Sequence, residues 1–88
     1  MAEIHVRKME GDTFEVTVKD GSATTHTVML SQEYYQKIAG GKISEETLIE
    51  KSFEFLLERE SNTSILSRFE LPVIGRYFPE YEKTIGNS

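Results

Sequence analysis

The residues best suited to acid–base or metal chemistry in this chain are two histidines, His5 and His26, because the sequence has no cysteine. Each histidine lies in a run that alternates polar and apolar residues, which is typical of a β-strand. In such strands His26 shares a face with Val28, whereas His5 points away from the apolar face of its own strand. Side chains on opposite faces of one sheet cannot bind the same metal ion, so we expect structural or exposed roles for both histidines.

Other catalytic arrangements also lack their residues. Without cysteine there is no thiol nucleophile, no thiolate metal site and no disulfide bond. The pair Gly40-Gly41 lacks the spacing of a phosphate-binding loop and the Lys-Ser/Thr that follows such a loop. The sequence therefore predicts no catalytic residue, no metal ligand and no cofactor.

The segment from about residue 45 to residue 60 has the strongest pattern for binding. Ser44 is a suitable N-cap, so the segment is predicted to be a helix. Because successive helical residues are about 100° apart, its apolar residues cover roughly 200° of the circumference, more than one face requires. Either the helix lies centrally in one monomer core, or part of the apolar arc is the seam of a homodimer. The arc comprises Leu48, Ile49, Phe53, Phe55, Leu56 and Leu57.

The opposite arc of the same predicted helix is acidic. Glu50, Glu54 and Glu58 follow one another at intervals of four residues. Like charges at this spacing destabilise a helix by roughly a few tenths of a kcal/mol per pair. Such an arc is typical of a solvated face that confers solubility, and a landing surface for a basic partner is the alternative interpretation.

Aromatic residues form two clusters, and each belongs either to the core or to a binding patch. Tyr34 and Tyr35 are adjacent in a predicted helix, and the other cluster lies near the C-terminus. Tyrosine is enriched at protein interfaces, so the C-terminal cluster is a candidate for partner recognition together with the central helix. The candidate partner-binding residues are Leu48, Phe55, Tyr77, Phe78 and Tyr81.

Three short strands, at about residues 3–9, 13–19 and 24–30, precede the predicted helices. They are joined by turns that contain Gly11 and Gly21, a pattern that predicts an antiparallel β-meander. The length of the second turn sets which residues lie opposite each other, because a slip of one residue turns every side chain to the other face. A three-residue loop is favoured, since it aligns the apolar residues of the second and third strands.

Helices are predicted at about residues 32–39, 45–60, 63–69 and 72–78, the last with an optional extension to residue 84. Ser31 and Ser44 are the expected N-caps of the first two. The 88 residues suffice for one domain, so residues 1–88 are predicted to form a single α+β domain. In this domain a three-stranded antiparallel meander packs on three or four helices.

The charge and hydropathy of the chain bear on its partners and location. A formal net charge of −5 disfavours nucleic acid and anionic lipid. The basic residues are scattered and form no basic stripe; Arg7-Lys8 is the one adjacent pair. No apolar run approaches the roughly 18 residues of a membrane span, and the N-terminus lacks the apolar core of a secretory signal. We therefore expect a soluble cytoplasmic protein.

The segment from Thr24 to Arg59 presents a strand, a short helix, a glycine-containing turn and a longer helix. This order resembles the ribbon-helix-helix family, in which two strands pair across a dimer and lie in the DNA major groove. The resemblance implies a DNA-binding regulator or antitoxin. The outward strand residues would be Thr25, Thr27 and Met29, which offer no Arg, Lys, Asn or Gln for base edges.

Residues 52–60 and 71–82 are similar to segments of short uncharacterised bacterial proteins. That resemblance implies a bacterial cytoplasmic origin and no particular activity. The leading functional prediction is a non-catalytic protein-interaction or regulatory module. Its partner would be another protein or a second copy of the chain, and the ribbon-helix-helix-like regulator is the alternative.

Overall fold

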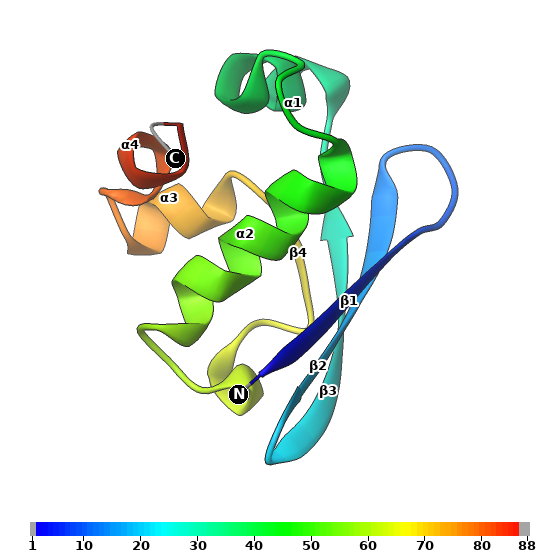
Figure 1. Cartoon of the computed structure of the whole chain (residues 1–88), viewed down its shortest axis with the longest axis vertical. Coiled ribbons are helices and arrows are strands. Elements are labelled where there is room, and N and C mark those ends of the chain that lie inside the picture. Colours follow the sequence, from blue (N-terminus) through cyan, green and yellow to red (C-terminus); the bar gives the residue numbers. More distant parts are fainter. Residues whose placement is uncertain (1, 87–88) are drawn as a thin grey trace.

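The alternating residues near the N-terminus form three consecutive antiparallel strands in the computed structural model, which describes residues 2–86 (Figure 1). These strands are β1 (Glu3–Lys8), β2 (Thr13–Asp20) and β3 (Ser22–Met29). The expected three-stranded antiparallel meander is incomplete, because a fourth strand, β4 (Arg68–Glu70), pairs in parallel with β3. Across the described residues the protein is an α+β fold with a four-stranded mixed sheet in the order β1-β2-β3-β4.

The register between β2 and β3 follows the prediction made from their apolar faces. Phe14 lies opposite Val28, and Asp20 lies opposite Ser22 across a tight loop. Gly21 at the tip of that loop has a φ of 82°, in the left-handed region that glycine adopts without strain. The aligned apolar side chains of both strands therefore face the helices.

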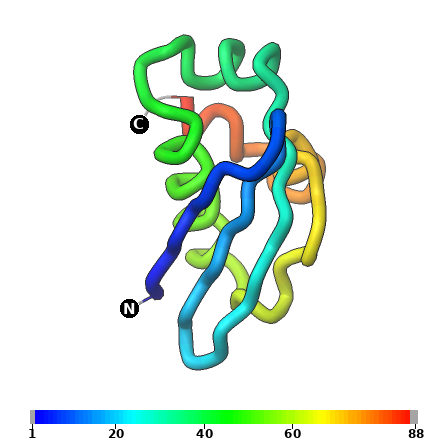
Figure 2. The backbone as a smooth tube through the Cα atoms, turned by 90° about the vertical axis from the view of Figure 1, so that its right-hand side faces the viewer, coloured from blue at the N-terminus to red at the C-terminus, as the bar shows by residue number. Residues whose placement is uncertain are grey.

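Within residues 2–86, four α-helices and one 3-10 turn accompany the strands. The central helix, α2, lies between the sheet and the two C-terminal helices (Figure 1). Figure 2 shows the strands side by side, with β1 at one edge and β4 at the other. The helical elements are α1 (Gln32–Ala39), α2 (Glu45–Leu57), η1 (Asn62–Ser64), α3 (Val73–Tyr77) and α4 (Tyr81–Gly86).

The predicted helix over residues 63–69 is wrong. The chain instead makes the 3-10 turn η1 and then extends into β4. In β4, Phe69 is 6% exposed and lies opposite Val28 on the face that the helices cover. Burial of this ring and pairing with β3 outweigh a weak local preference for helix.

The last predicted helix, residues 72–78 with an extension to 84, is two short helices. Phe78, at the end of α3, has an extended conformation with φ −130° and ψ 91°. The following Pro79 explains this break, because a proline disfavours helical geometry in the residue before it and has no N–H to donate. The chain therefore turns between α3 and α4.

The wide apolar arc of α2 is buried within a single chain. Phe53 points toward the sheet, with its ring centroid 5.4 Å from that of His26 and 6.0 Å from that of Phe69. Phe55 points toward the C-terminal helices, with its ring centroid 5.3 Å from that of Tyr81. Packing on two sides inside the monomer therefore accounts for the width of the apolar arc, in agreement with the interpretation of α2 as the central helix of one monomer core.

Replacing Gly40 by alanine is expected to destabilise the protein by about 1 kcal/mol. Gly40 ends α1 with a φ of 58°, where an added Cβ is strained even though its nearest neighbour, the Gln36 carbonyl oxygen at 3.9 Å, would be an ordinary contact. Denaturant unfolding would measure the change. Gly75→Ala is the matched control, because Gly75 lies in α3 without a positive φ and its Cβ would make ordinary contacts. Equal losses in both variants would contradict the explanation.

Candidate partner-binding groove

The fold divides the five residues proposed for partner binding between core and surface. Leu48, Phe55 and Tyr81 have exposed fractions of 0%, 3% and 0%. Phe78 is partly buried, and Tyr77 is 67% exposed. The ring of Phe55 contacts both Phe78 and Tyr81, with centroid distances of 5.8 and 5.3 Å. Of the five, Tyr77 and Phe78 are therefore the residues that contribute to the surface.

An apolar groove with a volume of about 290 Å³ lies between the C-terminal end of α2, the segment entering β4, and α3. Two of its residues, Leu66 and Tyr77, are among the most exposed large apolar side chains, at 46% and 67%. Sequence reasoning missed Leu66, because a helix was expected over residues 63–69. The lining also includes the apolar residues Leu56, Ile65, Phe69, Val73, Ile74 and Phe78 and the polar residues Glu60 and Ser64.

A buried polar network holds the segment entering β4 against β3. The Nδ1 atom of His26 lies 2.8 Å from the carbonyl oxygen of Leu66. A carbonyl only accepts, so Nδ1 donates to it, and Nε2 lies 2.9 Å from the Thr24 hydroxyl oxygen. The Asn62 amide donates to Thr24 Oγ1 at 3.1 Å and to the Ser22 carbonyl at 2.8 Å. His26 is therefore a structural residue that fixes one wall of the groove.

Two buried tyrosines join the helices behind the groove. The Tyr81 hydroxyl lies 2.6 Å from Ser52 Oγ, and Ser52 donates its one proton to the Leu48 carbonyl at 2.8 Å, so Tyr81 is the donor. Burial, the largest cause, raises the pKa of Tyr81 to about 12. Burial and a 2.8 Å hydrogen bond donated to Glu82 raise the pKa of Tyr34. Both phenols are therefore protonated donors at neutral pH.

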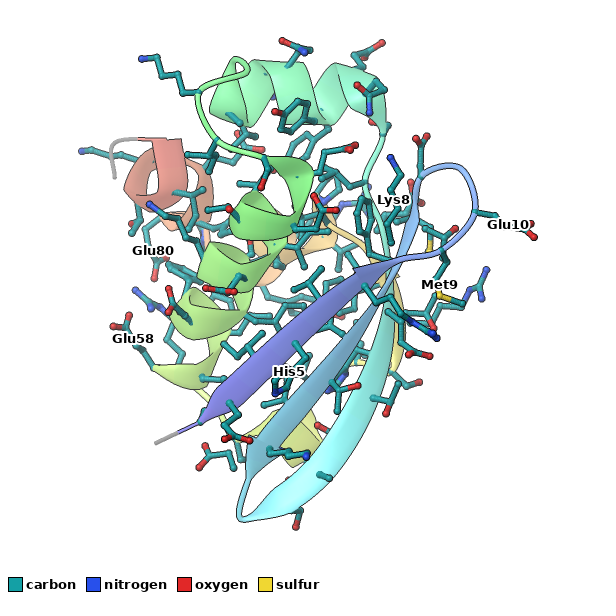
Figure 3. The ribbon with its side chains drawn as sticks, turned by 45° about the vertical axis from the view of Figure 1, so that its right-hand side comes forward. His5, Lys8, Met9, Glu10, Glu58 and Glu80 are labelled. Carbon is teal, nitrogen blue, oxygen red and sulfur yellow. The ribbon has the colours of Figure 1, made fainter. Side chains whose placement is uncertain are left out.

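Arg59 ties the end of α2 to the connection between α3 and α4. Its guanidinium carbon lies 3.6 Å from the centroid of the Phe55 ring, and it donates to the Phe55 carbonyl at 3.0 Å. It also forms ion pairs with Glu58 at 3.3 Å and Glu80 at 3.2 Å. Glu58 and Glu80 lie on the same side of the helical layer (Figure 3). This contact covers Phe55 from solvent.

The outer edge of β4, beside the groove, has unpaired backbone groups. The Thr27 N–H donates to the Ser67 carbonyl at 2.8 Å, and the Leu71 N–H donates to the Met29 carbonyl at 2.9 Å. Backbone groups alternate along a strand, so those of Arg68 and Glu70 point away from β3. Within residues 2–86 these groups form no hydrogen bond. β4 is therefore open to an added strand.

The charged residues do not form a second kind of site. His5 is exposed on the outer face and His26 is buried on the inner face, as the alternation of the strands predicted. No group of three His, Asp or Glu residues in the described part of the chain could hold a metal ion. Glu50, Glu54 and Glu58 are exposed along α2, as a solvated face would be. What the groove offers is apolar contact combined with backbone hydrogen bonding.

The strand β3, in the segment that resembles ribbon-helix-helix proteins, pairs with β2 on one side and β4 on the other. It therefore has no free edge for the pairing across a dimer that the resemblance implied.

Within residues 2–86, each helix is too short or too polar to span a lipid bilayer. Comparison of the chain with models of protein families, with curated proteins and with solved structures found no match.

Proposed function

We propose that this chain is a small, non-catalytic protein-interaction module that binds an extended segment of a partner at the groove and the open edge of β4. One observation carries the proposal: a groove of about 290 Å³ is lined by Phe69 of the same strand whose outer backbone groups, on Arg68 and Glu70, are unpaired. Addition of a strand to an open edge is a common mode of peptide recognition, in which the backbone supplies affinity and side-chain pockets supply specificity.

The alternation of a strand predicts the chemistry of the bound segment. Phe69 faces the helices, whereas Arg68 and Glu70 are exposed on the other face. Every second residue of an added strand would lie beside Phe69 and over the groove. We therefore expect the bound segment to alternate apolar and polar residues, with Leu66 and Tyr77 contributing additional apolar contact.

The absence of cysteine and the resemblance to short bacterial proteins support a cytoplasmic setting.

A DNA-binding regulator is the alternative function, and it has less support. The net charge of −5 opposes binding to phosphates. The strand that would enter the major groove is β3, which lies inside the sheet with both edges paired. The protein-interaction proposal needs no rearrangement of the sheet.

Selection of short random peptides displayed against the immobilised chain would test the proposal. We expect the selected peptides to alternate apolar and polar residues and to shift the amide resonances of Arg68 and Glu70. The double variant Leu66→Ser/Tyr77→Ala is expected to weaken their binding about tenfold or more, because exposed apolar and aromatic contacts dominate such interfaces.

The control for this selection is Met9→Ser. Met9 is 46% exposed, like Leu66, but lies at the turn between β1 and β2 (Figure 3). Its substitution should leave peptide binding unchanged. Peptides that bind the double variant as tightly as the unmodified chain, or a failure to select any peptide, would contradict the proposed function.

A further inference from the structure

The open edge of β4 carries two opposite charges with an apolar residue between them. Arg68 and Glu70 are exposed on the outer face, and Phe69 between them is buried on the inner face. In the described part of the chain, neither charged side chain forms an ion pair or a hydrogen bond. An antiparallel copy of this strand runs in the opposite direction, so its glutamate lies opposite the arginine of the first copy and its arginine lies opposite the glutamate. Two copies of the strand therefore have complementary charges.

We propose that the partner at this edge is a second copy of the chain, and that the two β4 strands pair antiparallel about a two-fold axis at Phe69. In this arrangement Arg68 of each copy lies opposite Glu70 of the other. The two four-stranded sheets then form one continuous sheet. The inference rests on the proposed function, because it names the occupant of the same edge and groove.

The charges select this register over its neighbours. Centring the axis on Arg68 would place two arginines opposite each other, and centring it on Glu70 would place two glutamates opposite each other. Directly opposed like charges destabilise a strand pair, whereas opposite charges stabilise it. A shift of one residue would turn Phe69 to the outer face of the joined sheet. Pairing centred on Phe69 avoids all three conflicts.

The backbone favours the same register, because centring on Phe69 pairs the outward groups of Arg68 with those of Glu70, whereas centring on either charged residue pairs the other with a residue outside β4. The outward N–H and C=O groups belong to Arg68 and Glu70, because Ser67 and Leu71 bond to β3. Opposed residues of an antiparallel pair alternate between those that exchange two hydrogen bonds and those that exchange none. With the axis at Phe69, each Arg68–Glu70 pair exchanges two backbone hydrogen bonds, and the two Phe69 residues form the closer pair without them. Charge and hydrogen bonding therefore agree.

The same pairing covers the exposed apolar residues beside β4. Antiparallel strands bring the start of one β4 next to the end of the other. Leu66 of one copy, just before its β4, then lies near the C-terminal end of β4 in the second copy. That end leads into α3 and Tyr77 of the second copy. Leu66 and Tyr77, which are 46% and 67% exposed in the single chain, gain apolar neighbours in this way. The two grooves meet across the axis on the inner face.

The opposite edge of the sheet, β1, is less suited to a second copy. Arg7 on that strand already forms an ion pair with Glu15 at 3.1 Å. α2 packs over β1 (Figure 1). A two-fold pairing at β1 would therefore bring two α2 helices together with their exposed residues Glu50 and Glu54. β4 is free of such a helix at its outer edge (Figure 2).

Sedimentation velocity over a range of concentrations tests the inference. We expect the unmodified chain to form a weak, concentration-dependent dimer. Arg68→Glu and Glu70→Arg should each weaken self-association about tenfold or more, because both opposed pairs become like charges. An equimolar mixture of these two variants should dimerise as well as the unmodified chain, since both opposed pairs are then Glu with Arg. This rescue excludes misfolding as the cause of the single-variant losses.

Glu3→Arg on β1 is the matched control, with the same change of charge on an exposed residue of the other edge strand. It should leave the dimer unchanged. In hydrogen exchange, the Arg68 and Glu70 amides should exchange more slowly at high protein concentration than at low concentration. A dimer that Glu3→Arg weakens, or that the mixed variants do not restore, would overturn the pairing at β4. A chain that stays monomeric throughout would overturn it too, whereas the peptide selection would still test the proposed function separately.

Discussion

Replacement of Phe53 by alanine is expected to lower the free energy of unfolding by about 3–5 kcal/mol. Phe53 is 0% exposed, and its ring lies between α2 and the sheet against His26 and Phe69. Alanine leaves a cavity that the surrounding strands fill only in part. A chain of this size has a total stability of roughly 5–13 kcal/mol, so the variant should be marginally folded at room temperature.

Urea unfolding followed by circular dichroism would measure this loss. Glu54→Ala is the matched control, because Glu54 is the next residue of α2 and points into solvent. Its substitution should change the stability by less than about 0.5 kcal/mol. Similar losses in the two variants would mean that α2 does not pack on the sheet as described. Because Phe69 contacts Phe53 and lines the groove, Phe53→Ala should also weaken binding at the groove.

Alkaline pH is expected to destabilise the protein by about 3 kcal/mol through Tyr81. Burial raises the pKa of Tyr81 to about 12 in the folded chain, and an unfolded tyrosine titrates near 10. Folding therefore favours the protonated phenol. The stabilisation is fully present below about pH 10 and is lost as the pH rises from about 10 to about 12. The pKa of Tyr34 is also raised, so its ionisation acts in the same direction.

Urea unfolding at a series of pH values between neutrality and about pH 11.5 would check this loss, of which about 2 kcal/mol is expected by the last value. Tyr81→Phe should flatten the alkaline part of the profile, because the titrating group is gone. At neutral pH this variant should cost only about 1 kcal/mol, since Ser52 keeps its hydrogen bond to the Leu48 carbonyl. Ser52→Ala should cost about 1–3 kcal/mol, because it leaves the buried Tyr81 hydroxyl without an acceptor. A steep alkaline decline that persists in Tyr81→Phe would contradict the assignment.

The position of the exposed apolar residues links the fold to the proposed interaction. Among the described residues, the exposed large apolar side chains are Met9, Leu66 and Tyr77. Two of these three border one groove, and that groove adjoins the open edge of β4. Scattered exposed apolar residues are ordinary on protein surfaces, whereas a cluster beside unpaired backbone groups favours a binding surface.

The sequence alone determined the features that depend on neighbouring residues. Alternation of apolar residues predicted β1, β2 and β3, and alignment of their faces predicted that Phe14 lies opposite Val28. Ser31 and Ser44 accept hydrogen bonds from the N–H groups of Tyr34 and Thr47, as N-caps should. These features arise within a few residues or across one tight turn, so the local pattern contains the physical cause.

Only the tertiary structure decided the features that connect distant parts of the chain. Residues 65–69 have no strong local preference, and they become strand because Phe69 is buried beside Val28 and the Leu66 carbonyl accepts a hydrogen bond from His26. Tyr77 and Tyr81 are the same residue type in one short segment, yet one is 67% exposed and the other 0%. Their difference comes from contacts with α2, which no pattern of neighbouring residues encodes. The groove and the open edge of β4 are products of this long-range packing.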